Sequence, residues 1–376
     1  MLGTVLRCDS AYTDIIVPLL RVGKFDLKKF RVALVWFEPT PEGTAPGYHL
    51  RGTRRRLAAS IGDQDIRVVE HRGPKDVKSI VKLGLRSLWV GIRSRNVVAR
   101  WHPAMLPILL LWRAFGCNVV LLVQGTFADS VAAHPVYGKF RPLAWAAHQS
   151  LRMANSTVAP HIGIARWVDT VRASQGTTVI PNGVPLLAAS TDPIEADFCL
   201  PDQYVAFVGS LATWQGVPVM LRAVREAAWP CEVHLVVAGD GLLRTLLEKE
   251  SHARVHYLGP VAPSQVRDVL RGSLASLSPK LADDVTKHGV SPFKLLEAGV
   301  ASTMIIASRI PGQEEYVVRH ACGLLVEPGS ARSLAQAVYS AWSDGSARRA
   351  MAERGRLAAK EMAWERNADD LFRLLL

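Results

Sequence analysis

Short apolar runs rich in Val, Leu and Ile alternate with helix-like stretches along most of the chain, and this alternation constrains the fold most. Arg31–Phe37, Tyr204–Val208 and Val233–Ala238 are examples of such runs. Runs that are apolar throughout are typical of parallel strands buried on both faces of a sheet. A strand, a helix and a second parallel strand form a right-handed crossover unit. The sequence therefore predicts an α/β protein with doubly wound sheets.

The alternation occurs in two series, separated by a loose Pro-containing stretch over Val184–Asp202. Because 376 residues are too many for one ordinary core, we expect two Rossmann-like domains that face a central cleft. The first would span residues 1–183 and the second residues 184–356, with a terminal helix at about 357–376 packing back on the first. In the first series we expect strands at Thr4–Cys8, Arg31–Phe37, Ile66–Glu70, Val97–Arg100 and Val119–Val123, and helices at Asp14–Val22, Gly52–Ile61, Asp76–Arg93 and Met105–Phe115. In the second we expect strands at Tyr204–Val208, Val233–Ala238, His256–Leu258, Leu274–Ser278, Ser302–Ala307 and Gly323–Val326, and helices at Val217–Ala228, Gly241–Lys249, Ser264–Arg271, Phe293–Val300, Arg332–Trp342 and Ser346–Phe372.

Several protein classes are disfavoured by simple counts. The longest apolar run, Pro103–Trp112, has about ten residues, whereas a membrane-spanning helix needs roughly 20. The first 14 residues become polar too early for a signal peptide. The five cysteines are scattered without a CxxC pair, which indicates neither disulfides nor a zinc site. We expect a cytoplasmic protein without a bound metal.

Positive charge is concentrated in the first half of the chain. Residues 1–180 hold 25 Lys and Arg against 11 Asp and Glu, while the remainder holds 20 against 22. Such a field favours an anionic partner, either a phosphorylated acceptor or the anionic cytoplasmic face of a membrane. The candidates for this contact are Lys75, Lys78, Lys82, Arg86, Arg93 and the cluster Arg51, Arg54, Arg55 and Arg56. A basic surface that is merely solvated is the alternative. No nucleic-acid-binding motif accompanies the charge, so we expect no nucleic-acid partner.

Glycine turns follow two strands of the second series. Gly209 comes directly after the strand at Tyr204–Val208, and Gly239 follows Val233–Ala238. Glycine lets a backbone approach a phosphate closely, and the helix that begins after such a turn offers free N–H groups. Both turns are therefore candidate anion sites, with Arg244 close behind the second. A tight turn with a purely structural role has the same sequence.

The segment His288–Ala298 combines a helix start with charged side chains. Ser291 before Pro292 is typical of an N-cap followed by proline at the first helical position, which would leave the preceding N–H groups free for an anion. Glu297 would lie one and a half turns inside the helix, where its carboxylate can accept both hydroxyls of a ribose. Lys294 would lie near the phosphates or, alternatively, in solvent.

These motifs, in this order and spacing, resemble the second domain of retaining GT-B glycosyltransferases of the large family 4. Residues 179–184 (VIPNGV) are similar to the family's hinge, and FVGSLATWQGV (207–217) to its first phosphate loop. VVAGDG (236–241), SPFKLLEAGVASTMIIAS (291–308) and GLLVEPG (323–329) are similar to the glycine turn, the nucleotide-binding helix and the closing segment. The likeness covers about 200 residues. The first half resembles the family only in its alternation of elements.

The resemblance implies transfer of a sugar from a nucleotide-sugar donor to a hydroxyl acceptor, with retention at the anomeric carbon and without a metal or other cofactor. UDP is the preferred donor nucleotide over GDP, and the acceptor is a small or lipid-linked, anionic molecule. By this analogy Glu297 holds the ribose and Val261 borders the base. The implied donor-site residues are Gly209, Ser210, Gln215, Gly239, Arg244, Val261, Gly289, Val290, Ser291, Pro292, Phe293 and Glu297, and the implied catalytic candidates are Lys294, His288, Gln124 and His102.

The chain departs from the family pattern at several positions. The family usually has a Glu eight residues before the ribose Glu, where this chain has Gly289 beside His288, and a basic pair where it has Ser210 and Gln215. A departing diphosphate needs cations or N–H dipoles. That role would fall to Lys294, Lys287 or Arg244. In the first half, Gln124 replaces the family's strand-end His, and His102 ends another strand. Asp9 and Asp14 are further acceptor-site candidates.

Two other functions remain open on the sequence alone. A GT-B relic that binds a nucleotide or a partner without transferring sugar would explain the missing Glu and basic pair. A dinucleotide-dependent oxidoreductase is disfavoured, because Asp9-Ser10-Ala11-Tyr12 stands after the first expected strand in place of a GxGxxG motif.

Overall fold

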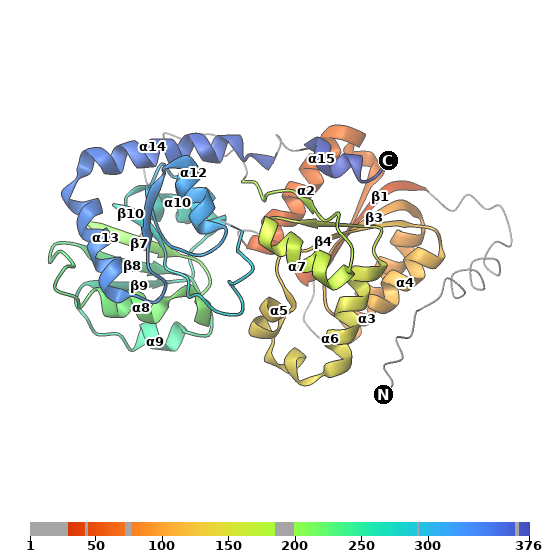
Figure 1. The fold of residues 1–376 in the computed structure, drawn as a ribbon, viewed down its shortest axis with the longest axis horizontal. Coiled ribbons are helices and arrows are strands. Elements are labelled where there is room, and N and C mark those ends of the chain that lie inside the picture. The colour runs from red at the N-terminus through yellow and green to blue at the C-terminus, as the bar shows by residue number, and fades with distance from the viewer. Residues whose placement is uncertain (1–28, 42–43, 72–76, 185–198, 292, 365–367) are drawn as a thin grey trace, which may run out of the picture.

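A computed structural model describes residues 29–41, 44–71, 77–184, 199–291, 293–364 and 368–376. The expected strand at Thr4–Cys8 and helix at Asp14–Val22 lie outside the described residues, as do Asp9 and Lys75. The described chain forms two lobes, each built around a six-stranded parallel sheet (Figure 1). The expected α/β fold with two doubly wound sheets is therefore confirmed.

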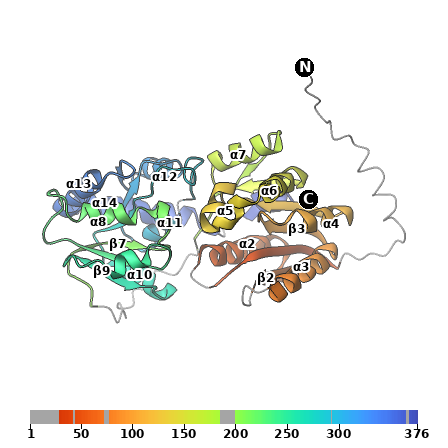
Figure 2. The same cartoon turned by 90° about the horizontal axis from the view of Figure 1, so that it is seen from below.

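The first lobe has the strand order β2-β1-β3-β4-β5-β6. Its central strands are fully buried because apolar residues face helices on both sides, as Val32–Trp36 shows. The strands are β1 (Phe30–Pro39), β2 (Ile66–His71), β3 (Ser94–Arg100), β4 (Asn118–Leu122), β5 (Ser156–Ala159) and β6 (Thr178–Val179). The helices are α2 (Ala45–Ile61), α3 (Val77–Ile92), α4 (Leu106–Ala114), α5 (Phe127–Ala133), α6 (Arg141–Met153) and α7 (Ile162–Arg172). Helix α2 packs on one face of the sheet, and α3, α4, α6 and α7 pack on the other (Figure 2).

The second lobe has the order β12-β11-β10-β7-β8-β9. Its strands are β7 (Tyr204–Val208), β8 (His234–Ala238), β9 (Val255–Gly259), β10 (Ala275–Ser278), β11 (Ile305–Ser308) and β12 (Gly323–Val326). Its helices are α8 (Val217–Ala223), α9 (Arg244–Glu248), α10 (Pro263–Arg271), α11 (Phe293–Val300), α12 (Gln313–His320), α13 (Ala331–Ser343) and α14 (Gly345–Glu361). Helices α8 and α13 cover one face, and α10, α11, α12 and α14 cover the other.

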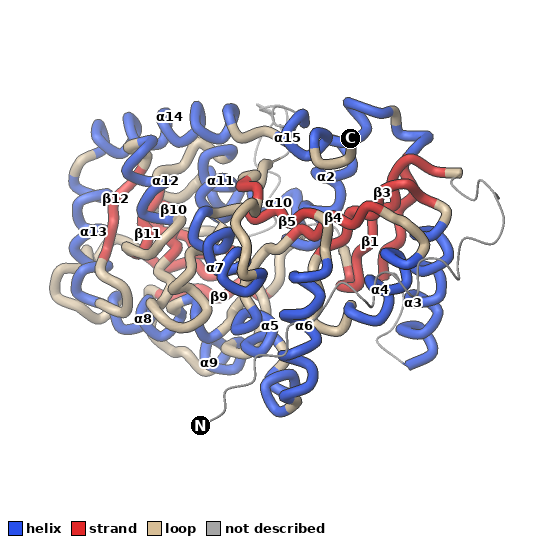
Figure 3. Tube along the Cα trace, turned by 45° about the vertical axis from the view of Figure 1, so that its right-hand side comes forward, coloured by secondary structure: helices blue, strands red, loops and turns tan. Residues whose placement is uncertain are grey.

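The end of the chain returns to the first lobe. The expected single helix over Ser346–Phe372 is wrong, because α14 ends at Glu361 and α15 (Ala368–Arg373) is a separate helix that packs on α2 (Figure 3). Between them, Ala363 pairs with Val184 as an isolated parallel bridge, which requires extended backbone. Leu371 of α15 is buried in the core of the first lobe. The last helix therefore completes that core.

Buried Arg56 fixes this return. Its guanidinium donates to the backbone carbonyls of Trp364, at 3.1 Å, and Pro181, at 2.9 Å, and lies 4.6 Å from the centre of the Trp364 ring. Arg54, on the same helix, instead forms an exposed two-bond pair with Asp63. Arg56 is thus not available to an external anion, contrary to expectation. No helix among the described residues is long and apolar enough to cross a membrane.

Candidate functional site

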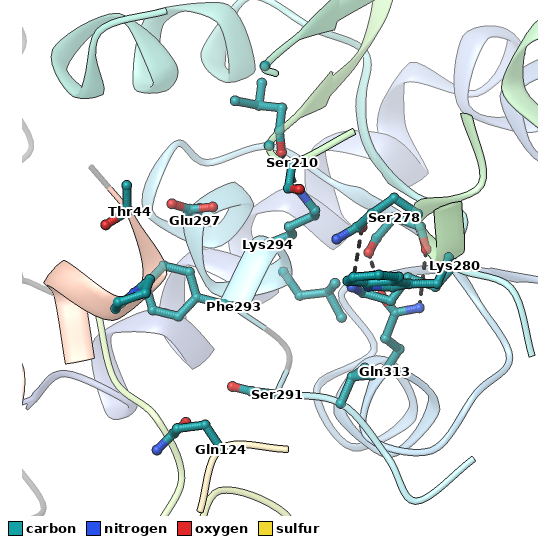
Figure 4. Close-up of a pocket in the computed structure, with 18 of the residues that line it drawn as sticks. Thr44, Gln124, Ser210, Ser278, Lys280, Ser291, Phe293, Lys294, Glu297 and Gln313 are labelled. Carbon is teal, nitrogen blue, oxygen red and sulfur yellow. Dashed lines mark hydrogen bonds between the residues drawn. The ribbon is translucent and has the colours of Figure 1, made fainter. Parts of the chain in front are cut away.

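A cavity of about 620 Å³ lies between the lobes at the carboxyl ends of the strands of the second sheet (Figure 4). Most of the residues expected at the donor site line it. They are Gly209, Ser210, Gln215, Gly239, Val261, Gly289, Val290, Ser291, Phe293, Lys294 and Glu297 from the second lobe, and Gln124 from the first. The structure therefore brings together residues that are far apart in sequence at one crevice, where open α/β sheets bind ligands.

Several expected residues are not among those that line this cavity. The exposed guanidinium of Arg244 forms a 2.7 Å hydrogen bond with Glu248 on its own helix. His288 is absent from the lining, and Lys287, named as a possible replacement cation, is exposed and paired with Asp284 at 2.8 Å. Pro292 lies outside the described residues. His102 lines an adjoining cavity instead.

Three of the backbone amides expected to bind an anion already have partners. The Gly289 amide donates to the Thr286 carbonyl at 2.9 Å, and the Val290 amide to the Pro311 carbonyl at 3.1 Å. The Gly209 amide donates to a carbonyl at the end of β8, also at 2.9 Å. None of these three N–H groups is free for a phosphate. Charge for an anion must come from side chains or from amides farther into α11.

Lys294 supplies such a charge directly beneath the first glycine turn. Its Nζ donates to the Val208 carbonyl at 2.5 Å and lies 4.5 Å from the centre of the Phe207 ring. The φ of Gly209 is +138°, which favours glycine, and a Cβ there would displace this Nζ from its position. Burial lowers the pKa of Lys294 to about 8, and burial also raises the pKa of Glu297 to about 7.

A second cation in the cavity, Lys280, was not found by the sequence analysis. Only 9% exposed, it donates to Gln215 Oε1 at 3.2 Å and lines the cavity. Burial, followed by repulsion from Lys294, lowers its pKa to about 7 against the opposing effect of Asp129 and Asp283. Lysines 280 and 294 thus supply the cavity with cationic side chains, whereas the first phosphate loop lacks the basic pair of the family pattern.

The signal for Lys280 was present in the sequence. It stands two residues after the end of β10, at the same sheet edge as the glycine turns. Its neighbour Ser278 is fixed by Gln313, whose amide donates to the Ser278 carbonyl at 3.1 Å. Neither a glycine turn nor a family motif marks the end of this strand, and Lys280 was missed for that reason.

The missing family Glu has a steric explanation. Gly289 has a φ of +94°, and a Cβ there would lie 2.2 Å from Nδ1 of His161, a residue of the first lobe. His161 accepts a hydrogen bond from the Gly163 amide and lies 3.5 Å from Glu315 Oε1. The imidazole of His161 occupies the space beside this loop, so a side chain at position 289 would collide with it.

Asn182 joins the two lobes behind the cavity. Its Nδ2 donates to Gln124 Oε1 of the first lobe and to Ser291 Oγ of the second, both at 2.8 Å. The side chain is 4% exposed. Two residues that line the cavity from opposite lobes are therefore fixed by one amide group. The sequence did not predict that Gln124 and Ser291 share Asn182 as a hydrogen-bond donor.

An adjoining cavity of about 520 Å³ lies on the first-lobe side and shares Gln124 and Asp129 with the main one. His102 lines it, and burial lowers the pKa of this imidazole. Arg100 forms a 3.0 Å ion pair with Glu38 in the same wall. Among the described residues there is no cluster of three His, Cys, Asp or Glu side chains suited to a metal ion. The wall of the second cavity thus contains the neutral imidazole of His102 and the paired charges of Arg100 and Glu38.

Comparison with known proteins connects this site to a family. Residues 202–344 match the family model described as Glycosyl transferases group 1. The chain is 30% identical over 180 residues to a D-inositol 3-phosphate glycosyltransferase of Rhodococcus opacus strain B4, covering 44% of this chain and 39% of that protein. An uncharacterized glycosyltransferase of Methanocaldococcus jannaschii is 23% identical over 164 residues, covering 43% of this chain and 44% of that protein. The chain thus matches about two fifths of the length of these curated relatives.

Solved structures match almost the whole fold. The crystal structure of Anabaena HepE in complex with UDP aligns with a TM-score of 0.68 at 14% identity, covering 92% of this chain and 99% of that one. Sucrose-phosphate synthase from Thermosynechococcus elongatus aligns with a TM-score of 0.69 at 15% identity, covering 92% and 98%. The two facing parallel sheets with a crevice at their strand ends are the GT-B fold, and residues 202–344 are similar to the glycosyl transferases of group 1.

Proposed function

We propose that this protein is a retaining, family 4-like glycosyltransferase that moves a hexosyl group from a nucleotide sugar, with UDP preferred over GDP, to a hydroxyl of the acceptor. The observation that carries the proposal is the joint presence of Glu297, Lys294 and Lys280 in one cavity between the lobes. One carboxylate and two ammonium groups are the side chains that a ribose and a diphosphate require. The HepE complex with UDP supports the choice of nucleotide.

In this proposal the second lobe holds the donor. Glu297 accepts the two ribose hydroxyls, Val261 borders the base, and Lys294 and Lys280 neutralise the diphosphate as it leaves. Preorganised charge at a leaving group is the largest contribution to many enzymatic rate enhancements. Because two ammonium groups can supply that charge, we propose that the reaction requires no metal ion or other cofactor.

The first lobe would hold the acceptor, with Gln124 and His102 nearest to the reacting hydroxyl. Gln124 lines both cavities, so it lies where donor and acceptor would meet. The low pKa of His102 leaves its imidazole neutral and able to accept a proton. The positive charge of this half supports an anionic acceptor and contact with an anionic membrane face. The phosphorylated acceptor named for the Rhodococcus relative is of this chemical kind.

Calorimetric titration with UDP, GDP, ADP and NAD tests the proposal. We expect UDP to bind, and Glu297→Gln to weaken binding at least tenfold, because a carboxylate that accepts two hydroxyls becomes an amide with one acceptor oxygen. The matched control is Glu327→Gln, on an exposed glutamate paired with Arg309 outside the cavity. Binding of NAD alone would identify an oxidoreductase instead, and equal UDP affinity in the two variants would refute the ribose role.

A nucleotide-binding relic without transfer activity is the second candidate, favoured by the closed position at Gly289. Lys280 and Lys294 argue against it, because the carboxylates of Asp129, Asp283 and Glu297 offset the desolvation of these two ammonium groups only in part, and an anionic ligand would offset more of it. Release of UDP from UDP-sugars, with and without an acceptor mixture, separates the two. The anomeric configuration of the product, measured by NMR, tests retention.

A further inference from the structure

A third cavity of about 480 Å³ continues from the acceptor-side cavity to the outer surface of the first lobe. The two share Glu38, His102 and Tyr137, so they form one continuous depression. Toward the surface its walls become apolar and come from β1, α3 and α4. The apolar lining includes Phe37, Ile80, Leu83, Met105 and Ile108. We call this part the α3–α4 groove.

The outer face of α3, next to this groove, carries an unusual stripe of exposed apolar side chains. Val81, Leu85 and Trp89 recur every four residues, so they share one side of the helix, and they are 53%, 64% and 53% exposed. Ile80, at the mouth of the groove, is 55% exposed. Helix α4 packs against α3 and adds Leu110, Leu111 and Phe115, each about two-fifths exposed. Several large apolar side chains left exposed on two helices that pack together are typical of a binding face.

Basic residues run beside the apolar stripe. Lys78, Lys82 and Arg86 also recur every four residues and are exposed, and the guanidinium of Arg93 lies 4.5 Å from the centre of the Trp89 ring. Neither α3 nor α4 contains an acidic residue. Apolar side chains with an aromatic ring, flanked by a row of cations, are the pattern of a helix that lies in the interface of an anionic bilayer. A protein surface would require acidic groups facing the same row.

We propose that the α3–α4 face docks on an anionic membrane and that the α3–α4 groove takes the hydrocarbon chain of an amphiphilic acceptor. This inference rests on the proposed glycosyl transfer only for the fate of the acceptor's head group. The continuity of the cavities carries it: a chain entering between Ile80 and Ile108 would place the polar end of its molecule beside His102, toward Gln124. The docked face and the groove mouth share Ile80, so a lipid can enter from the bilayer.

Vesicle flotation tests the docking surface without any donor or turnover. We expect the full chain to bind vesicles of phosphatidylcholine with 30% phosphatidylglycerol, and to bind pure phosphatidylcholine much less, since each basic residue near an anionic surface contributes about fivefold. Leu85→Glu should reduce binding at least tenfold, whereas its control Leu242→Glu, on an equally exposed leucine of the second lobe, should not. Absence of wild-type binding, or equal binding by Leu85→Glu, would overturn the proposal. So would a Leu85-dependent dimer that forms without lipid.

Gly84 provides a separate test of the groove. It lines the groove within α3, and a Cβ there would meet no atom within 4 Å. Gly84→Phe should therefore fill the groove without disturbing the fold, while Gly84→Ala controls for the change in helix propensity. Titration with butyl, hexyl and octyl phosphate should show affinity rising by up to about fourfold per methylene in the wild type and in Gly84→Ala.

In Gly84→Phe the dependence on chain length should disappear, with vesicle binding and UDP binding unchanged. Affinity that is independent of chain length in the wild type, or that rises equally in Gly84→Phe, would refute the groove assignment. If the wild type did not bind UDP, the proposed function would be contradicted, but the vesicle and alkyl phosphate measurements would still test the docking face and the groove. The two failures are therefore distinguishable.

Discussion

Binding of UDP should be accompanied by proton uptake, chiefly at Lys280. In the empty cavity burial and Lys294 lower the pKa of Lys280 from 10.5 to about 7, so at pH 8 about nine-tenths of these side chains are neutral. A diphosphate beside the ammonium group would favour its charged form and raise this pKa again. Full recovery of the shift corresponds to an upper limit of ~4.8 kcal/mol. At pH 8 we expect Lys280 to take up about 0.9 proton. Lys294, whose pKa is about 8, should take up about 0.5 proton more.

The sign of the pH dependence follows from this uptake. Because the complex binds more protons than the free components, affinity falls as pH rises from about 8, where Glu297 with its pKa of about 7 is already mostly ionised, toward the pKa of Lys280 in the complex. The fall is up to about tenfold per pH unit for each lysine that takes up a proton. The nucleotide's own phosphate, with a pKa near 6, does not titrate in this range.

Calorimetry in phosphate and Tris buffers, whose ionisation enthalpies differ, counts the protons. Lys280→Met should lose more than half of the uptake at pH 8 and flatten the pH dependence, while Lys287→Met, on an exposed lysine paired with Asp284, should retain both. Equal proton uptake by wild type and Lys280→Met would refute this account of the site, provided that both proteins show the same unfolding transition.

Four further outcomes follow from the contacts described. Gly209→Ala should weaken UDP binding at least tenfold, because its Cβ would displace the Lys294 ammonium; Gly176→Ala, with a similar positive φ of +124° but open space around it, should leave calorimetric affinity unchanged, and equal affinities would contradict the packing. Asn182→Ala should lower kcat by about 10- to 100-fold with little change in UDP affinity, since the lobes lose their shared amide; an unchanged kcat would refute a positioning role. Arg56→Met should lower the free energy of unfolding in urea by about 3 kcal/mol, against less than about 1 kcal/mol for the exposed Arg54→Met; similar losses would be the contrary result. In the ligand-free protein the lowered pKa of Lys280 should make stability rise with pH between about 7 and 10, since only the unfolded chain holds that proton, and the slope should be smaller in Lys280→Met.

Regular elements with strong local signals were predicted well from sequence. The expected helix Phe293–Val300 and strand Gly323–Val326 have those bounds in the structure, because a proline start and a short apolar run between turns define them locally. The helix over Ser346–Phe372 was wrong because its interruption has a tertiary cause. The backbone near Ala363 leaves the helical conformation to pair with Val184, which is 179 residues away.

In the candidate site, too, features with a local sequence signal were predicted and features set by tertiary contacts were not. Pattern and resemblance placed Glu297 and Lys294 in one crevice with Gly209. They did not show that the amides of Gly289 and Val290 are already hydrogen-bonded, because their carbonyl partners are set by loop geometry rather than by residue type. The collision that keeps position 289 a glycine comes from the other lobe, and no local pattern records it.

The burial of Leu371 in the first lobe has a consequence for synthesis of the protein. While the ribosome makes the second lobe, the first lobe already has its strands but lacks α15, so the outer side of α2 is not yet covered. Helix α15 seals that layer, and it follows the whole second lobe in the sequence. Folding of the earliest-made lobe can therefore be completed only after the second lobe has been synthesised.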